Sequence, residues 1–125
     1  MQQFSLDWWL AYQKVWNKNS EVSVKFSGIG KVVFSFLDDR EISVCLEWDK
    51  SGQIIRVQEI ENLELNLPIF SATKKNWQNF IAQEFKAAQA VMMGKIKYQG
   101  SFYFIFKYGK NFDYLAIIAQ QVNKN

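Results

Sequence analysis

The first apolar pattern in the chain has the period of a helix. Five large side chains near the N-terminus share one helical face: Trp8, Trp9, Tyr12, Val15 and Trp16. Ser5 precedes them as an N-cap, and Asp7 stands in the first turn, where a negative charge suits the helix dipole. The pattern predicts a helix that ends within residues 17–20 and turns its row of rings toward a sheet.

Alternation of apolar and polar residues then predicts strands. The segments are "KVVFSFL", "EISVCLEW", "QIIRVQ" and "NLELNLP". In the last of them three leucines alternate with polar residues, and Pro68 is expected to stop the pairing. The turns between successive segments are short, which favours antiparallel neighbours.

The period becomes helical again over residues 73–93, with a break expected within residues 86–88 because one straight helix of that length would measure about 30 Å. Gly94 stands where a left-handed C-cap is wanted. Residues 95–99 alternate as a fifth strand, and "NFDYLAIIAQQV" closes the chain as an amphipathic helix. No internal repeat or linker divides the sequence.

Composition and charge fit one globular domain that spans residues 1–125. Aromatic residues make up 17% of the chain, so large rings will build its interior. The net charge of +3 favours transient contact with an anionic membrane surface or an acidic partner, but falls short of a dedicated nucleic-acid binder. The single Cys45, a start without signal-peptide features and short apolar runs lead us to expect a soluble cytoplasmic protein.

Catalytic chemistry has few candidate residues. The sequence contains no histidine, the commonest general base and a common metal ligand. Cys45 lies within a predicted strand with no residue nearby to activate it, and the acidic cluster of Glu59, Glu61 and Glu64 is typical of a solvated edge. We therefore expect no enzyme, no catalytic residue, no metal site and no cofactor.

An RNA-binding sheet is one alternative. "KYQGSFYFIFKY" loosely resembles the aromatic and basic strand on which such sheets stack bases. Ser101 stands where the first stacking ring is needed, however, and Lys107 falls at the last aromatic position. We expect no nucleic-acid partner.

The order of these patterns is similar to that of the sterol carrier protein type 2 family. The likeness is carried by "WNKN" before "GKVVFSF" and by "AVMMGKIKYQGSFYFIFKYGKNFDYL", and it extends over nearly the whole chain in the manner of small single-domain prokaryotic members. The resemblance implies an α+β fold with a five-stranded antiparallel sheet and helices over one face. It also implies an apolar tunnel between sheet and helices that holds lipid-like ligands.

The resemblance bears on the aromatic segment after Gly100. On alternation alone, residues 95–107 could form one strand about 43 Å long, more than twice a typical length. The family pattern instead ends the strand near Gly100 and begins a helix capped by Ser101. We expect the helix over residues 101–108, because short strands cannot pair so long a partner.

The resemblance also assigns the ligand site. We expect an acyl chain, a sterol-like molecule or an isoprenoid lipid to be bound, and possible transfer between surfaces, without turnover. The candidate ligand-binding residues are Trp77, Phe80, Ile81, Phe85, Met92, Met93, Ile96, Phe102, Phe106 and Leu115. Methionine fills irregular apolar spaces, and of the adjacent pair we expect Met93 to face the ligand.

A second hypothesis assigns the apolar surface to an interface. The protein would then be a structural or accessory module whose aromatic helix face binds another protein or a second copy. The sequence leaves both a monomer and a homodimer open.

Overall fold

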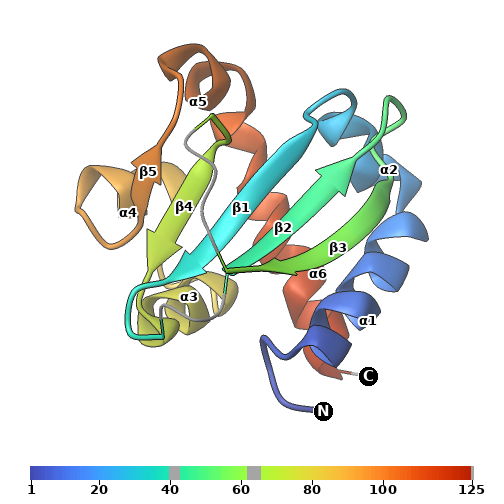
Figure 1. The fold of residues 1–125 in the computed structure, drawn as a ribbon, viewed down its shortest axis with the longest axis horizontal. Helices are drawn as coiled ribbons and strands as arrows, with labels where there is room; N and C mark the ends of the chain where they lie inside the picture. The colour runs from blue at the N-terminus through green and yellow to red at the C-terminus, as the bar shows by residue number, and fades with distance from the viewer. Residues whose placement is uncertain (40–42, 62–65, 125) are drawn as a thin grey trace.

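One five-stranded sheet and a set of helices make up the structure (Figure 1). The computed structural model describes residues 1–39, 43–61 and 66–124. In chain order the elements are α1 (Leu6–Asn17), α2 (Ser20–Ser23), the 3-10 turn η1 (Val24–Phe26), β1 (Lys31–Phe36), β2 (Ser43–Trp48), β3 (Ile54–Ile60), β4 (Ile69–Ala72), α3 (Lys74–Ile81), α4 (Ala87–Met92), β5 (Lys97–Gln99), α5 (Phe102–Tyr108), the 3-10 turn η2 (Gly109–Asn111) and α6 (Asp113–Lys124).

The sheet is mixed, so the expectation of a purely antiparallel sheet is wrong. Its strand order is β3-β2-β1-β4-β5, and three of the four pairings are antiparallel. The central pair of β1 and β4 is parallel, with Phe34 opposite Phe70. The reason is topological: β4 follows β3 in the chain but lies on the far side of β1, so no hairpin turn dictates its direction.

The fourth strand lies later in the chain than the alternation predicted. Of the segment "NLELNLP", residues 62–65 lie outside the described residues, and Leu67 is not in a strand. The strand instead begins at Ile69, directly after Pro68. Proline cannot donate to the ladder, but its carbonyl oxygen accepts a hydrogen bond from the Val33 N–H at 2.9 Å. Pro68 therefore opens the pairing that it was expected to stop.

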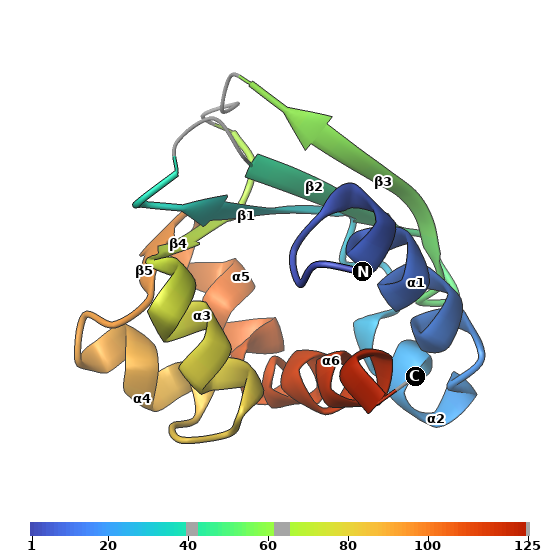
Figure 2. The same ribbon diagram turned by 90° about the horizontal axis from the view of Figure 1, so that it is seen from below.

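The helices cover one face of the sheet (Figure 2). Alternate strand residues such as Phe34, Phe36 and Leu46 point into the large core beneath them. Their neighbours Val33 and Cys45 belong to a small second cluster on the opposite face. The structure thus confirms an α+β architecture with helices on one side.

The aromatic row of α1 is part of this core. Trp9 stacks on Phe34 with 5.8 Å between ring centroids, and Trp16 packs edge-on against Trp48 at the same separation. The Trp16 indole N–H donates to the Gly52 carbonyl oxygen at 2.8 Å, which satisfies its polar edge inside the core. Because these rings are buried, α1 does not offer the exposed aromatic face that the interface hypothesis requires.

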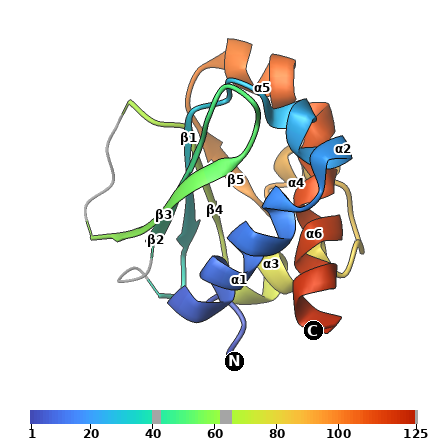
Figure 3. The same ribbon diagram turned by 90° about the vertical axis from the view of Figure 1, so that its right-hand side faces the viewer.

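α1 and α6 lie side by side under the sheet, and both termini lie at the same end of the molecule (Figure 3).

Among the helices that the structure describes, none combines the length and the apolar character needed to cross a bilayer.

The predictions after residue 72 hold with one shift in position. The helical region divides into α3 and α4 as expected, but the break spans residues 82–86 and so begins earlier than the predicted 86–88. Gly94 follows α4 in the predicted left-handed conformation, with φ +75°. The strand β5 ends at Gln99, and Ser101 caps α5 by accepting a hydrogen bond from the Phe104 N–H at 3.1 Å. Since this segment is helical, it cannot be the long stacking strand of an RNA-binding sheet.

Candidate ligand-binding site

A pocket of about 380 Å³ lies between the sheet and the helices α3, α4 and α5. This volume falls within the range of small-molecule sites in proteins, about 300–1,000 Å³. Its walls are almost entirely apolar. The residues that line it are Phe34, Phe70, Trp77, Phe80, Ala87, Ala88, Val91, Met92, Ile96, Ile105, Phe106, Gly109, Lys110, Phe112 and Leu115.

The floor of the pocket consists of aromatic rings that the parallel pairing of β1 and β4 brings side by side. Their register sets Phe34 opposite Phe70, and the two rings stack with centroids 6.3 Å apart. Phe112, just before α6, packs edge-on against Phe70 at 4.7 Å. Three rings from three distant parts of the chain thus form one continuous surface.

The α3 wall is fixed to that floor. The Trp77 indole N–H donates to the Ser35 carbonyl oxygen at 3.0 Å, so the polar edge of the ring is satisfied by the sheet. The ring also meets Phe34 edge-on at 5.8 Å. Trp77 therefore presents carbon atoms alone to the pocket, and the wall is anchored where it meets the floor.

The mouth of the pocket lies between α4 and α5. Met92 and Phe106 both line the pocket, yet their side chains are 88% and 79% exposed. Side chains that face both the pocket and solvent mark the opening. Lys110 is the one charged side chain among the described residues that line the pocket, and it is also exposed.

A smaller space of about 30 Å³ lies deeper, among α1, α3 and α6. It shares Phe34, Trp77, Phe80 and Leu115 with the larger pocket. The side chains of Trp77, Phe80 and Leu115 therefore act as a partition between two adjoining apolar spaces.

The structure brings most of the candidate residues together. Six of the ten line the larger pocket: Trp77, Phe80, Met92, Ile96, Phe106 and Leu115. Ile81 lines the smaller space. Phe85 is buried outside both linings, with the Lys95 ammonium 5.4 Å from its ring centroid.

Met93 and Phe102 are placed elsewhere. Both side chains are exposed, at 59% and 81%, and neither lines a pocket. Adjacent helical residues point about 100° apart, and it is Met92 of the pair that turns toward the pocket. The structure therefore places Met92 at the pocket, where we had expected Met93.

Sequence reasoning missed several lining residues. Phe34 carried a usable signal, because alternation along "KVVFSFL" sets it on the same side of the strand as Val32 and Phe36. Phe70 and Phe112 had none, since one lies in a strand that alternation misplaced and the other in a turn before α6.

The described residues offer little for metal chemistry. Within residues 1–39, 43–61 and 66–124, no three His, Cys, Asp or Glu side chains gather closely enough to hold a metal ion.

Comparisons with known proteins complete the description. No protein-family model matches the sequence, and no curated protein matches it either. Solved structures do. A conserved hypothetical protein from Thermus thermophilus, described as "possibly sterol carrier protein", superimposes with a TM-score of 0.81 at 18% identity, over 98% of this chain and 90% of that one.

Two further solved structures have a similar fold. A crystal structure of sterol carrier protein 2 gives a TM-score of 0.80 at 16% identity, with 96% of this chain and 98% of that one covered. A UbiJ-SCP2 ubiquinone synthesis protein gives 0.59 at 13% identity, over 88% and 85% of the two chains. The chain therefore has the sterol carrier protein 2 fold, as its sequence pattern predicted.

Proposed function

We propose that this protein binds an apolar lipid in the pocket between the sheet and α3, α4 and α5. The observation that carries the proposal is the lining itself, in which carbon-rich side chains surround the space and Lys110 is the one charged side chain among the described residues. The names of the similar structures, sterol carrier proteins among them, support the same ligand class.

The driving force is removal of apolar surface from water. Each Å² withdrawn contributes about 25 cal/mol, so an acyl chain, a sterol-like ring system or an isoprenoid gains affinity in proportion to the surface it buries. A ligand with an acidic head group would place its charge beside Lys110 at the mouth and its tail along the rings of Phe34 and Phe70.

We further propose that the two apolar spaces join into one tunnel when a lipid is bound. Phe80 and Trp77 separate the larger pocket from the smaller space, and both residues belong to a helix of eight residues. A change of rotamer at Phe80 would join the two spaces, so a long tail could extend beneath α1.

Binding without turnover is the proposed mode of action. Lys110 is a donor and a positive charge, and its ammonium group has no lone pair with which to accept a proton. No carboxylate or thiol side chain stands among the described lining residues to complete a catalytic pair. We retain the cytoplasm as the proposed location, since one cysteine cannot form an intramolecular disulfide.

Extraction of the purified protein with organic solvent, followed by mass spectrometry, tests the proposal. We expect a lipid in stoichiometric amount, and delipidated protein should bind a fluorescent fatty acid with one site per chain. A clean extract together with no saturable binding of acyl, sterol-like or isoprenoid probes would contradict it.

The interface hypothesis retains one supporting observation. Within the part of the chain that the structure describes, the exposed aromatic rings belong to α5, where Phe102, Tyr103 and Phe106 face solvent. Light scattering on the purified protein would detect a homodimer built on this surface.

A further inference from the structure

The net positive charge of this protein comes from one stretch of its sequence. Residues 85–112 carry five lysines and no acidic residue, whereas the rest of the chain carries ten basic and twelve acidic residues. The whole net charge of +3 therefore originates in the segment that builds α4, β5, α5 and η2. The lysines concerned are Lys86, Lys95, Lys97, Lys107 and Lys110.

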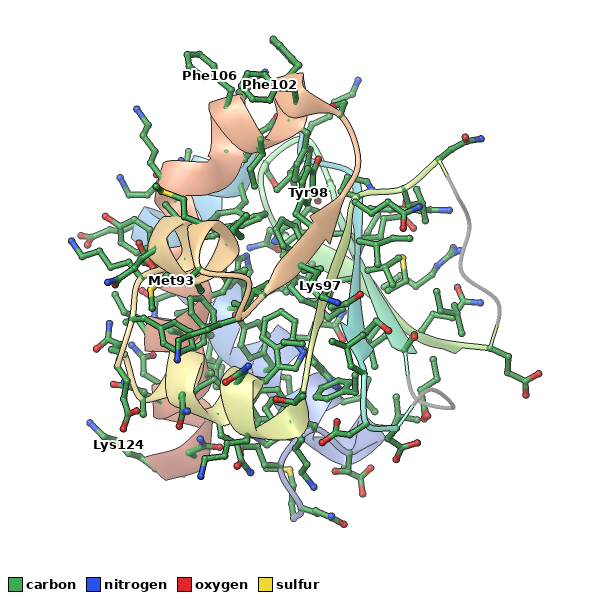
Figure 4. The ribbon with its side chains drawn as sticks, turned by 90° about the vertical axis from the view of Figure 1, so that its left-hand side faces the viewer. Met93, Lys97, Tyr98, Phe102, Phe106 and Lys124 are labelled. Carbon is green, nitrogen blue, oxygen red and sulfur yellow. The ribbon has the colours of Figure 1, made fainter. Side chains whose placement is uncertain are left out.

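The same stretch exposes large apolar side chains. Phe102 and Phe106 are one helical turn apart on α5 and project together from the end of the molecule (Figure 4). Phe104 of the same helix points into the core, so α5 is apolar on its buried side and on its exposed side. Helices of that kind normally pack on both sides, which indicates that α5 meets a second apolar phase.

The exposed rings are accompanied by cations. Tyr103 is 70% exposed, and the Lys107 ammonium lies 5.9 Å from its ring centroid and 5.2 Å from that of Tyr108. Aromatic rings beside lysines are the combination that membrane interfaces select, because the rings enter the acyl boundary while the ammonium groups remain among the phosphates.

This surface is continuous with the pocket. Phe106 and Met92 contribute to the exposed surface and also line the mouth. A lipid leaving a membrane at α5 would therefore pass between these two side chains without crossing water.

We propose that α5 and the adjoining end of α4 form a docking surface for an anionic lipid bilayer. The surface is defined by Met92, Phe102, Tyr103, Phe106, Lys107 and Lys110. The inference rests on the proposed lipid-binding function and adds where the ligand is exchanged. We choose an anionic bilayer as the partner because it complements both features of this surface. Its acyl chains can take up the exposed rings, and its phosphate groups can attract the lysines of residues 85–112, a segment without acidic residues.

Co-sedimentation of the full chain with phosphatidylcholine vesicles, with and without about one quarter phosphatidylglycerol, tests the proposal. We expect partitioning onto the anionic vesicles and little onto the neutral ones. Raising the salt concentration should release the protein, because screening weakens lysine–phosphate attraction beyond about 10 Å at 0.1 M salt.

Two single variants test the residues without altering the pocket lining. Phe102→Ser should lower the partition coefficient about tenfold, since the inserted ring is lost. Lys107→Glu should lower it about 25-fold, because each lysine near an anionic surface contributes about fivefold and the reversal counts twice.

Matched controls come from elements other than α4 and α5. Lys124→Glu makes the same charge change at the end of α6, distant from Phe102 and Phe106 (Figure 4), and Ile55→Ser removes an exposed apolar side chain from β3. Both should leave partitioning within about twofold of the parent, allowing for the weak long-range effect of one charge at that distance.

The outcomes separate the two proposals. Fluorescent fatty acid bound in solution, with no preference for anionic vesicles, would overturn the docking surface and leave lipid binding intact. Equal losses in Lys107→Glu and Lys124→Glu would overturn it too, as would a solution dimer that Phe102→Ser dissociates. Vesicle binding that depends on Phe102 and Lys107 in a protein that binds no lipid probe would support the docking surface and contradict the proposed function.

Discussion

The carboxylate of Asp113, the first residue of α6, accepts a hydrogen bond from the backbone N–H of Ala87, the first residue of α4, at 2.8 Å. Lys86, the residue that precedes α4, supplies no side-chain cap of its own. A carboxylate from another helix therefore satisfies one of the free N–H groups at the start of α4. Because Met92 ends that helix, the contact links the pocket mouth to α6.

Replacement of Asp113 should loosen this link. Asp113→Ala is expected to lower the free energy of unfolding by about 1 kcal/mol, the usual cost of losing a helix cap, and to accelerate release of a bound fatty acid. Asp113→Asn keeps an acceptor oxygen and should cost less. Glu84→Ala is the control, since it removes an exposed acid from the segment just before α4. Equal losses in Asp113→Ala and Glu84→Ala in denaturant titrations would show that the contact contributes nothing.

The partition between the two apolar spaces predicts ligand length selection. Phe80→Leu should widen the connection and shift the affinity toward longer fatty acids, because Phe80 lines both spaces. Phe85→Leu is a matched control, since Phe85 is buried on the same stretch but lines neither space. Both variants should lose about 1 kcal/mol of stability. An unchanged preference in Phe80→Leu, measured over fatty acids of increasing length, would argue against a connected tunnel.

Local signals explain which elements could be predicted from the sequence. Ser5 is a cap followed by apolar residues at helical spacing, and α1 begins where this pattern places it. The helix α5 was predicted from the family resemblance instead, because local alternation also allowed a long strand, and Ser101 caps it as expected. The position of β4 is not a local property. Pro68 marks the end of pairing by composition, yet its carbonyl oxygen is used by Val33, which is 35 positions earlier in the chain.

The site residues also divide into those that local patterns predict and those that depend on pairing between distant parts of the chain. Trp77 and Phe80 could be predicted because one helical stripe carries them to one surface. Phe70 could not, since it lies beside Phe34 only through the parallel pairing of β1 and β4. The choice between Met92 and Met93 depends on the rotation of a six-residue helix, which the packing of α4 determines and the spacing of residues does not.

Tyr12 predicts a dependence of stability on alkaline pH. Its hydroxyl donates to the Leu115 carbonyl oxygen at 2.9 Å inside the core, and burial raises the pKa of Tyr12 well above its ordinary value of 10.0. The folded state thus holds this proton more tightly than the unfolded chain does. The resulting stability is complete below pH 10 and is lost as the pH rises above it.

Denaturant titrations between about pH 9 and 11 measure this effect, since the unfolded tyrosine titrates near 10. The parent and the exposed variant Tyr103→Phe should lose stability with the same slope, whereas Tyr12→Phe should show a shallower one. Identical slopes in the two variants would mean that other groups account for the alkaline transition.

The two adjacent methionines give the most direct test of the pocket mouth. Met92 lines the pocket and Met93 does not, although both belong to the same turn at the end of α4 and both are exposed. Met92→Ala should weaken binding of a fluorescent fatty acid about threefold, because the ligand loses roughly 25 Å² of apolar contact at about 25 cal/mol per Å². Met93→Ala should leave that affinity unchanged. Neither variant should lose more than about 1 kcal/mol of stability in the delipidated state, far less than the 2–5 kcal/mol for a packed methionine. The comparison controls for helix propensity, since alanine replaces the same residue type at neighbouring positions. A greater loss of affinity in Met93→Ala than in Met92→Ala would move the mouth to the other side of α4.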